Sequence, residues 1–435
     1  MMKKLTLFMF LLWAFTAQAQ NYVSYFTGND LDVVTSPLGG VCLMGGATES
    51  DDAMKWFLER CDGGDVLVLR ASGSDGYNDY LYSELGISVN SVETIVCNSP
   101  FAEDEEYIQE KISKAEAIWF AGGDQWNYIT YWRNGPIEDL INEAISQRNI
   151  VIGGTSAGMA ILGRYYFNAM NGTTTSSAAL SNPFANTVTP DAESFLNVPT
   201  LSEVITDTHF DSPDRRGRLL TFIARIYTDE GVYAKGIACD EYTAVCVDEN
   251  GLARVFGDYP NNDDNAYFIQ VNCENSEMQP ETCSSGQPLT WNRDGAALKV
   301  YRVKGTVEGT NTFDLTDWQT GNGGDWLHWS AENGVFTESV GTAIECSNVG
   351  VLENALPDLR WTVFPNPCAE DILTIQSEKT FFTLKIVDAT GRNVLSEKFS
   401  PTVQYQVNVS VLAPGTYQIS QESAEGITTK TLLIQ

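Results

Sequence analysis

Short apolar runs alternate with helix-like segments along the first half of the chain. The apolar runs have the pattern of buried strands and lie at 40–46, 65–70, 92–97, 117–121 and 150–153. The helical patterns between them lie at 51–60, 108–114 and 136–147. Continuous apolar strands separated by helices are typical of a parallel sheet that is covered on both faces. We therefore predict an α/β fold with a parallel sheet.

Glycines and polar residues follow several of the predicted strands. They include Gly45-Gly46, Ser72-Gly73, the segment 122–125 and Ser156. In open α/β sheets, ligands bind beyond the carboxyl ends of the strands. We therefore expect these segments to converge on one site.

The strand that begins near residue 150 runs into Gly-Gly-Thr-Ser-Ala-Gly, which contains a G-x-S-x-G motif centred on Ser156. A helix-like segment follows at 159–162. A nucleophile elbow has this order of strand, serine and helix, and its glycines give room for the sharp turn. Backbone amides at the start of the helix can stabilise an oxyanion. Ser156 is the candidate nucleophile, and an ordinary strand-to-helix turn is the alternative.

A serine nucleophile needs a base, and the chain has two histidines. His209 follows a β-rich segment, whereas His328 lies far downstream among aromatic residues and is expected to be structural. An acidic residue should orient the imidazole. Spacing alone does not choose among the four candidates, which are Asp207, Asp211, Asp240 and Glu241.

Four motifs occur in order: Gly-Gly-Asp-Gln at 122–125, Gly-Thr-Ser-Ala-Gly at 154–158, Asp-Thr-His-Phe at 207–210 and Asp-Glu-Tyr-Thr-Ala at 240–244. Together they resemble cyanophycinase and its relative peptidase E, an aspartyl dipeptidase. The resemblance covers about 39–257, within a predicted catalytic domain at 22–257. It implies a serine exopeptidase, without a cofactor or metal, on a three-layer sheet like that of class I glutamine amidotransferases. It also implies a peptide substrate and a homodimer.

The resemblance also implies roles for individual residues. The triad would be Ser156, His209 and Glu241, and the oxyanion hole would be formed by the amides of Gly122, Gly123 and Ala157. The substrate pocket would contain Gln125, Asp207, Arg215 and Arg218. Guanidinium groups suit bidentate capture of a carboxylate, which fits aspartyl substrates such as the β-aspartyl-arginine units of cyanophycin.

Two positions depart from the family pattern. Thr208 stands where cyanophycinases carry glutamine, and Pro213 stands at the position of one of three arginines. These departures make short α-aspartyl or isoaspartyl peptides the alternative substrates. A noncatalytic binding protein on the same fold is a third hypothesis, motivated by the tryptophans at 291, 318, 326 and 329.

The amino terminus has the pattern of a secretory signal peptide at 1–19, with two lysines, an apolar run and Ala-Gln-Ala. The apolar run is too short for a permanent membrane span, and no later segment qualifies. The formal net charge of −31 argues against nucleic acid or an anionic membrane as a partner. The nine cysteines lack the paired spacing of a zinc site. Cys273 and Cys283 are the best disulfide candidate.

The pattern changes after residue 257. We predict a β-rich extension at 258–346, in which the tryptophans are mainly core residues, and a linker at 347–361. Residues 362–435 contain five short strands with period-two alternation, which indicates a small β-sandwich. Its Pro-Asn-Pro start and its Leu-Ala-Pro-Gly-Thr-Tyr motif resemble the C-terminal sorting domain of type IX secretion cargo. That implies the type IX machinery as a partner and a secreted or cell-surface location, whereas an Ig-like accessory module is the alternative.

Overall fold

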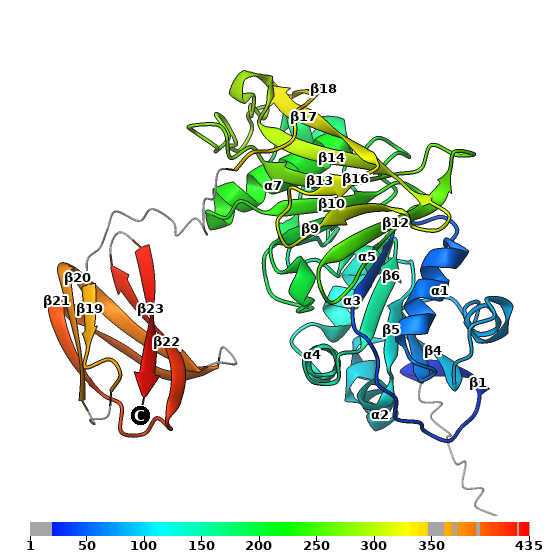
Figure 1. Cartoon of the computed structure of the whole chain (residues 1–435), viewed down its shortest axis with the longest axis horizontal. Coiled ribbons are helices and arrows are strands. Elements are labelled where there is room, and N and C mark those ends of the chain that lie inside the picture. The colour runs from blue at the N-terminus through cyan, green and yellow to red at the C-terminus, as the bar shows by residue number, and fades with distance from the viewer. Residues whose placement is uncertain (1–19, 347–360, 369–371, 389–391, 424–425, 435) are drawn as a thin grey trace, which may run out of the picture. The chain divides into compact units, whose positions relative to one another are not determined.

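A computed structural model describes residues 20–346, 361–368, 372–388, 392–423 and 426–434 (Figure 1). The predicted signal peptide lies outside the described residues, as does the predicted linker except for Trp361, which begins strand β19. The chain forms two compact units, of which the first ends at Glu345 and the second begins at Cys346.

The first unit contains a ten-stranded sheet with a parallel centre. Its parallel strands, in spatial order, are β4 (Ser91–Cys97), β3 (Asp65–Arg70), β5 (Ala117–Phe120), β6 (Val151–Thr155) and β2 (Val41–Met44). Antiparallel strands extend both edges: β1 (Tyr22–Gly28) beside β4, and β11 (Ala244–Val247), β12 (Leu252–Tyr259), β15 (Asn311–Asp314) and β16 (Gly321–Asn322) beyond β2. The predicted parallel sheet is therefore present.

Helices cover both faces of this sheet (Figure 1). They are α1 (Asp51–Arg60), α2 (Glu106–Lys114), α3 (Gln125–Trp132), α4 (Pro136–Arg148) and α5 (Ala157–Ala160). Alternate side chains of one strand enter different cores: Val66 and Val68 of β3 join the cluster that contains α1, and Leu67 joins the cluster that contains α2, α3 and α4. A strand that is buried on both faces needs apolar residues throughout, which is why these strands read as continuous apolar runs.

A second sheet packs beside the first. Its six strands, in spatial order, are β18 (Val335–Val340), β17 (Gly324–Glu332), β14 (Leu298–Lys304), β13 (Asn265–Val271), β10 (Lys235–Cys239) and β9 (Val204–Asp207). Helices α7 (Arg216–Glu230) and α6 (Ser176–Ser181) cover one face, and β11 and β12 of the first sheet pack against the other. Strands β7 (Tyr166–Phe167) and β8 (Pro190–Asp191) form a small two-stranded antiparallel sheet.

Residues 258–345 belong to the same compact unit as the predicted catalytic domain at 22–257. The reason is the strand pairing. Strands β13, β14, β17 and β18 continue the sheet that begins with β9 and β10, and β15 pairs with β12. Trp291, Trp318 and Trp329 are buried in the core, as predicted.

The predicted pairing of Cys273 with Cys283 is wrong. Cys273 and Cys346 are the disulfide-bonded cysteines, and Cys283 is free. The chain after β18 returns to the neighbourhood of Cys273, where the Glu345 N–H donates to Oε1 of Glu274 at 2.8 Å. A long-range return of this kind leaves no trace in local spacing.

The second unit is a five-stranded antiparallel sheet with its own apolar core. Its strands are β19 (Trp361–Phe364), β20 (Ile372–Asp388), β21 (Asn393–Asn408), β22 (Gly415–Ser423) and β23 (Gly426–Ile434). Two predicted short strands, 372–375 and 383–387, belong to the single strand β20, whose pairing with β21 shifts register between Gln376 and Phe381. The described residues thus form five strands, as many as the alternation predicts, but β20 combines two predicted strands and β19 is an additional one.

Candidate active site

Ser156 occupies a sharp turn between β6 and α5. Its backbone angles are φ 53° and ψ −115°, a conformation that a residue other than glycine rarely adopts and that stores strain. A methyl group on Gly154 would lie 2.6 Å from the carbonyl carbon of Gly158, and one on Gly158 would lie 2.1 Å from the Phe120 oxygen. Both glycines are therefore required, and the turn has the geometry of a nucleophile elbow.

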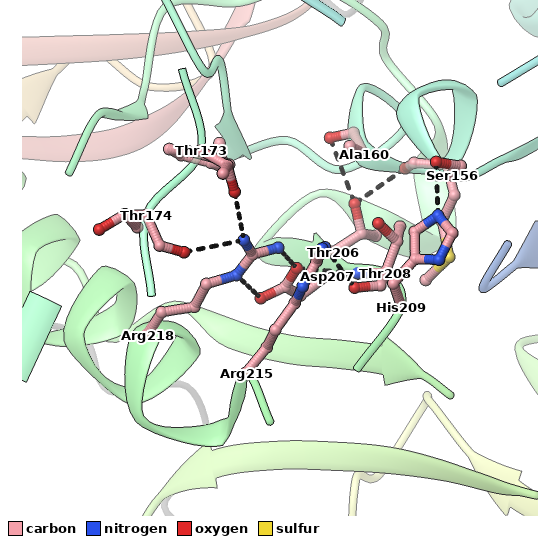
Figure 2. A network of polar contacts seen from close by, with 12 residues as sticks. Ser156, Ala160, Thr173, Thr174, Thr206, Asp207, Thr208, His209, Arg215 and Arg218 are labelled. Carbon is pink, nitrogen blue, oxygen red and sulfur yellow. Dashed lines mark hydrogen bonds and ion pairs between the residues drawn. The ribbon is translucent and has the colours of Figure 1, made fainter. Parts of the chain in front are cut away.

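His209 follows β9 and points toward Ser156 (Figure 2). Its Nε2 lies 2.8 Å from Oγ of Ser156, and its backbone N–H donates to the Gly45 carbonyl at 2.8 Å. A methyl group on Gly46 would lie 2.4 Å from Nε2 of His209. The Gly-Gly pair after β2 therefore anchors the histidine backbone and leaves room for its imidazole.

Glu241 supplies the carboxylate that contacts the histidine. Its Oε1 lies 2.6 Å from Nδ1 of His209. Its own backbone N–H donates to Oδ1 of Asp211 at 2.9 Å. Asp211 thus supports the loop that carries Glu241, a contribution that the sequence analysis did not assign.

Asp240 has a different partner, although it is adjacent to Glu241. Its Oδ2 accepts hydrogen bonds from Nδ2 of Asn265 at 2.9 Å and from the Asn265 N–H at 3.2 Å. Burial raises the pKa of Asp240 to about 7. Asp207 does not contact His209 either, because it forms an ion pair with Arg218. Of the four candidate carboxylates, Glu241 is the one that reaches His209.

The residues named for the oxyanion hole lie beside Ser156. A methyl group on Gly122 would be 3.6 Å from Cβ of Ser156. Gly123 and Ala157 line the same cavity as Ser156. Ala157 begins α5, so its N–H has no acceptor within the helix. Gly122, Gly123 and Ala157 therefore lie near the turn that carries Ser156.

A cavity of about 460 Å³ opens in front of Ser156 and His209. This size suits a small molecule or a short peptide. Gln125 begins α3, lines the cavity and donates from Nε2 to the Phe167 carbonyl at 3.2 Å. Residues 169–173 contribute a wall that the sequence analysis missed, and no pattern in that segment indicates a pocket. The apolar part of the lining includes Trp126, Phe167 and Met170.

Arg218 and Asp207 form an ion pair inside the protein, and each side chain is 3% exposed. Nε of Arg218 donates to Oδ2 of Asp207 at 2.9 Å, and Nη2 donates to Oδ1. Nη1 donates to Oγ1 of Thr173 at 3.2 Å and to the Thr174 carbonyl at 3.3 Å (Figure 2). The expected capture of a substrate carboxylate by Arg218 is not what this geometry favours, because Asp207 already occupies its guanidinium.

Arg215 is arranged differently. Its Nη1 donates to the Thr208 carbonyl at 2.8 Å, and its Nε is buried without a hydrogen-bond partner among the described residues. Burial, together with the nearby charge of Arg218, lowers the pKa of Arg215 to about 10. Arg215 therefore presents a partly desolvated cation to the cavity that holds Ser156.

In the part of the chain that the structure describes, no group of three or more histidine, cysteine, aspartate or glutamate side chains could hold a metal ion. No helix in that part is long and apolar enough to cross a membrane.

The comparisons with known proteins support a peptidase of the hydrolase class. Residues 74–254 match the model of peptidase family S51. Residues 362–435 match the secretion system C-terminal sorting domain.

The proteins that match this chain share little sequence identity with it. A cyanophycinase of Synechococcus elongatus is 26% identical over 227 residues, which are 50% of this chain and 66% of the relative. A cyanophycinase of Geminocystis herdmanii is 28% identical over 155 residues, 36% of this chain and 51% of the relative. The chain thus spans between half and two thirds of the length of these relatives. A solved peptidase from an acI-B1 Actinobacterium has a TM-score of 0.41 and 15% identity, and covers 64% of this chain and 98% of its own.

Proposed function

We propose that this protein is an exported serine exopeptidase that hydrolyses aspartyl-containing peptides. Ser156 is the nucleophile, His209 the base and Glu241 the orienting carboxylate. The observation that carries the proposal is the hydrogen-bond chain from Ser156 through His209 to Glu241, in a cavity that also presents Arg215.

The reaction follows from this chain of contacts. Nδ1 of His209 carries a proton and donates it in a hydrogen bond to Glu241, so Nε2 is free to accept the proton of Ser156. Oγ of Ser156 attacks the scissile carbonyl, and the amides of Gly122, Gly123 and Ala157 stabilise the oxyanion. The imidazolium then protonates the leaving amine. Water, deprotonated by His209, hydrolyses the acyl-enzyme and frees the serine.

Arg215 sets the substrate class in this proposal. A partly buried guanidinium with an unpaired Nε–H favours a planar anion, and a carboxylate matches it in two hydrogen bonds. Asp207 and Arg218 neutralise each other and support the pocket wall at Thr173 and Thr174. The Arg215 guanidinium donates to the Thr208 carbonyl but has no carboxylate partner among the described residues, which suits the single side-chain carboxylate of an aspartyl unit.

The substrate is either the cyanophycin polymer or a short aspartyl peptide. The names of the curated relatives favour cyanophycin or its β-aspartyl-arginine units. Thr208 and Pro213 replace the glutamine and one arginine of the family pattern, and Arg218 is already paired, which favours short α-aspartyl or isoaspartyl dipeptides. Both groups of substrates use the same serine mechanism.

Export is the second part of the proposal. The sorting domain at 362–435 supports passage out of the cell by the type IX route. The signal-peptide pattern at 1–19 supports a first step across the inner membrane. The peptidase would then act on peptides outside the cell or at its surface. The homodimer and the likeness to class I glutamine amidotransferases stay predictions.

The test is to incubate the purified mature protein separately with cyanophycin, β-aspartyl-arginine, and α- and isoaspartyl dipeptides, and to measure released products. The Ser156→Ala variant is the control in each reaction. Hydrolysis of at least one aspartyl substrate by the wild type alone is expected. If all substrates stay intact and a serine-directed phosphonate fails to label Ser156, the noncatalytic binding protein is the better account.

A further inference from the structure

Two cysteines face each other between the strands that frame the active site. Cys42 lies in β2 and Cys246 in β11, and the two residues are directly opposite in this antiparallel pair. Their Sγ atoms are 3.4 Å apart. Both residues are fully buried, at 0% exposure, in the core that contains α1.

The register of the two strands suits a bond between these sulfur atoms. The Gly45 N–H donates to the Thr243 carbonyl at 2.9 Å, so Gly45 and Thr243 are a hydrogen-bonded pair. Hydrogen-bonded and non-hydrogen-bonded pairs alternate along an antiparallel ladder. Cys42 and Cys246, three positions away, are therefore a non-hydrogen-bonded pair, in which the Cα atoms are about 4.5 Å apart. Disulfides span Cα separations of roughly 4.4–6.8 Å.

We propose that Cys42 and Cys246 form a disulfide bond when the protein folds after export. In the oxidising compartment, the thiolate of one cysteine attacks an exchangeable disulfide, such as that of a thiol oxidase or of oxidised glutathione. This attack forms a mixed disulfide and releases one thiol. The second thiolate then displaces the remaining thiol from the mixed disulfide. Two cysteine thiols are oxidised, and one small disulfide is reduced to two thiols. Cys273 and Cys346 are disulfide-bonded, which agrees with folding under oxidising conditions.

The bond must form before the core closes. In the folded protein the Cys246 thiol is fully buried, and burial raises its pKa well above the ordinary value. Thiol–disulfide exchange requires a thiolate that an oxidant can reach. The cytosolic, unfolded chain is therefore expected to hold both thiols reduced, and oxidation to accompany folding outside the cytosol.

The bond would join the two strands that position the site. The carbonyl of Met44 accepts the Ser156 N–H at 3.1 Å, and the carbonyl of Gly45 accepts the His209 N–H at 2.8 Å. The carbonyl of Gly46 accepts the N–H of Tyr242, the residue after Glu241, at 3.0 Å. A covalent link between β2 and β11 would hold these backbone contacts in place without contacting the cavity. The inference does not depend on the proposed peptidase activity.

Cys239 provides a matched control. It lies in β10, is also fully buried, and its Sγ lies 3.7 Å from the Leu43 carbonyl. It belongs to a different core cluster from Cys42 and Cys246. Trypsin leaves Cys239 and Cys246 in one peptide, 236–254, and Cys42 in the peptide that ends at Lys55. A Cys239→Ala variant therefore shows which cysteine of the first peptide is bonded.

The test uses the full chain, exported to an oxidising periplasm or refolded in reduced and oxidised glutathione. The protein is denatured with N-ethylmaleimide and without reductant, digested and analysed by mass spectrometry. The proposal predicts a linked pair of the two peptides in the wild type and in Cys239→Ala, and no such pair in Cys42→Ala. It also predicts that Cys42→Ala lowers Tm by roughly 5–10 °C more than Cys239→Ala.

Labelling of both Cys42 and Cys246 in the oxidised wild type would overturn the proposal. Loss of the linked peptides in Cys239→Ala would overturn it as well, because Cys239 would then be the partner of Cys42. If Cys42→Ala fails to fold, the wild type and Cys239→Ala still give the decisive comparison.

Discussion

Nδ1 of His209 lies 2.6 Å from Oε1 of Glu241, across 32 positions of sequence. Both residues are held by backbone contacts outside the side-chain pair. The His209 N–H donates to Gly45, and the Glu241 N–H donates to Asp211. Because both loops are fixed in this way, the carboxylate can orient the imidazole toward Ser156 without a large cost in side-chain entropy.

Removal of the nucleophile or the base should abolish turnover. Ser156→Ala and His209→Ala are each expected to lower kcat on the order of a million-fold or somewhat less. The double variant should be hardly slower than either single one, because the two groups act as a unit. Steady-state kinetics on the best aspartyl substrate measures this, and circular dichroism checks the fold. Substantial turnover by Ser156→Ala would remove the serine mechanism.

The adjacent carboxylates should differ in their effect on catalysis. Glu241→Gln is expected to lower kcat by roughly 10⁴-fold, since the amide favours the wrong imidazole tautomer. Asp240→Asn should change kcat by less than about tenfold, because Asp240 contacts Asn265 instead of His209. The reverse ranking, measured under the same conditions, would make Asp240 the third member of the triad.

Arg215 should govern affinity for the substrate carboxylate. Arg215→Gln is expected to lower kcat/KM by roughly 10- to 100-fold for aspartyl peptides, mainly through KM. The matched control is Arg216→Gln, because Arg216 pairs with Asp214 and Glu338 and is not part of the cavity lining. Equal effects of the two changes, or an equal loss on a substrate without the side-chain carboxylate, would contradict carboxylate capture by Arg215.

Asp240 should make the stability of the first unit depend on pH. Burial raises its pKa in the folded state to about 7, above an unfolded value of about 3.9. The folded state therefore binds the proton more tightly, and the free energy of unfolding falls as pH rises from about 4 to about 7. Each unit of pKa difference corresponds to about 1.4 kcal/mol.

Asp240→Asn should remove this contribution. Denaturant unfolding at pH 4, 5.5 and 7 should show the variant gaining stability relative to the wild type as pH rises. Asp79→Asn, a change at an exposed carboxylate, serves as the control and should follow the wild type. A constant difference between Asp240→Asn and the wild type at all three pH values would refute the assignment.

The sorting domain should be separable from the peptidase. Deletion of 362–435 is expected to leave the first unit folded and active, because that unit ends at Glu345 and has its own cores. The truncated protein should accumulate in the periplasm, whereas full-length Ser156→Ala should be exported normally. Immunoblots of cell fractions and medium measure this. Normal release of the truncated protein would contradict the sorting role.

Local chemistry made the elbow and most of the catalytic sheet predictable. Helix α1 and strand β3 have the predicted bounds, because a buried strand or an amphipathic helix repeats its own pattern over several residues. The glycines beside Ser156 are recognisable from the motif, because a sharp strand-to-helix turn leaves no room for a methyl group on Gly154 beside Gly158 or on Gly158 beside Phe120 of β5. The separate C-terminal unit was also predictable as a β-structure, because apolar and polar residues alternate with period two along its strands.

Contacts between distant segments were decided only by the tertiary structure. Asp240 and Glu241 are adjacent in the sequence, but their side chains point in different directions. Asp240 therefore contacts Asn265, and Glu241 contacts His209. The sequence suggests that Arg218 binds the substrate, whereas the structure shows that Arg218 forms an ion pair with Asp207.

The inclusion of 258–345 in the first unit and the failed pairing of Cys273 with Cys283 have the same physical reason. Strand pairing and disulfide bonding depend on which distant segment lies alongside, and the local sequence does not record this. The sequence by itself therefore determined most elements of the parallel sheet and the candidate nucleophile. Which carboxylate, which cation and which strands complete the site followed from packing between residues far apart in the chain.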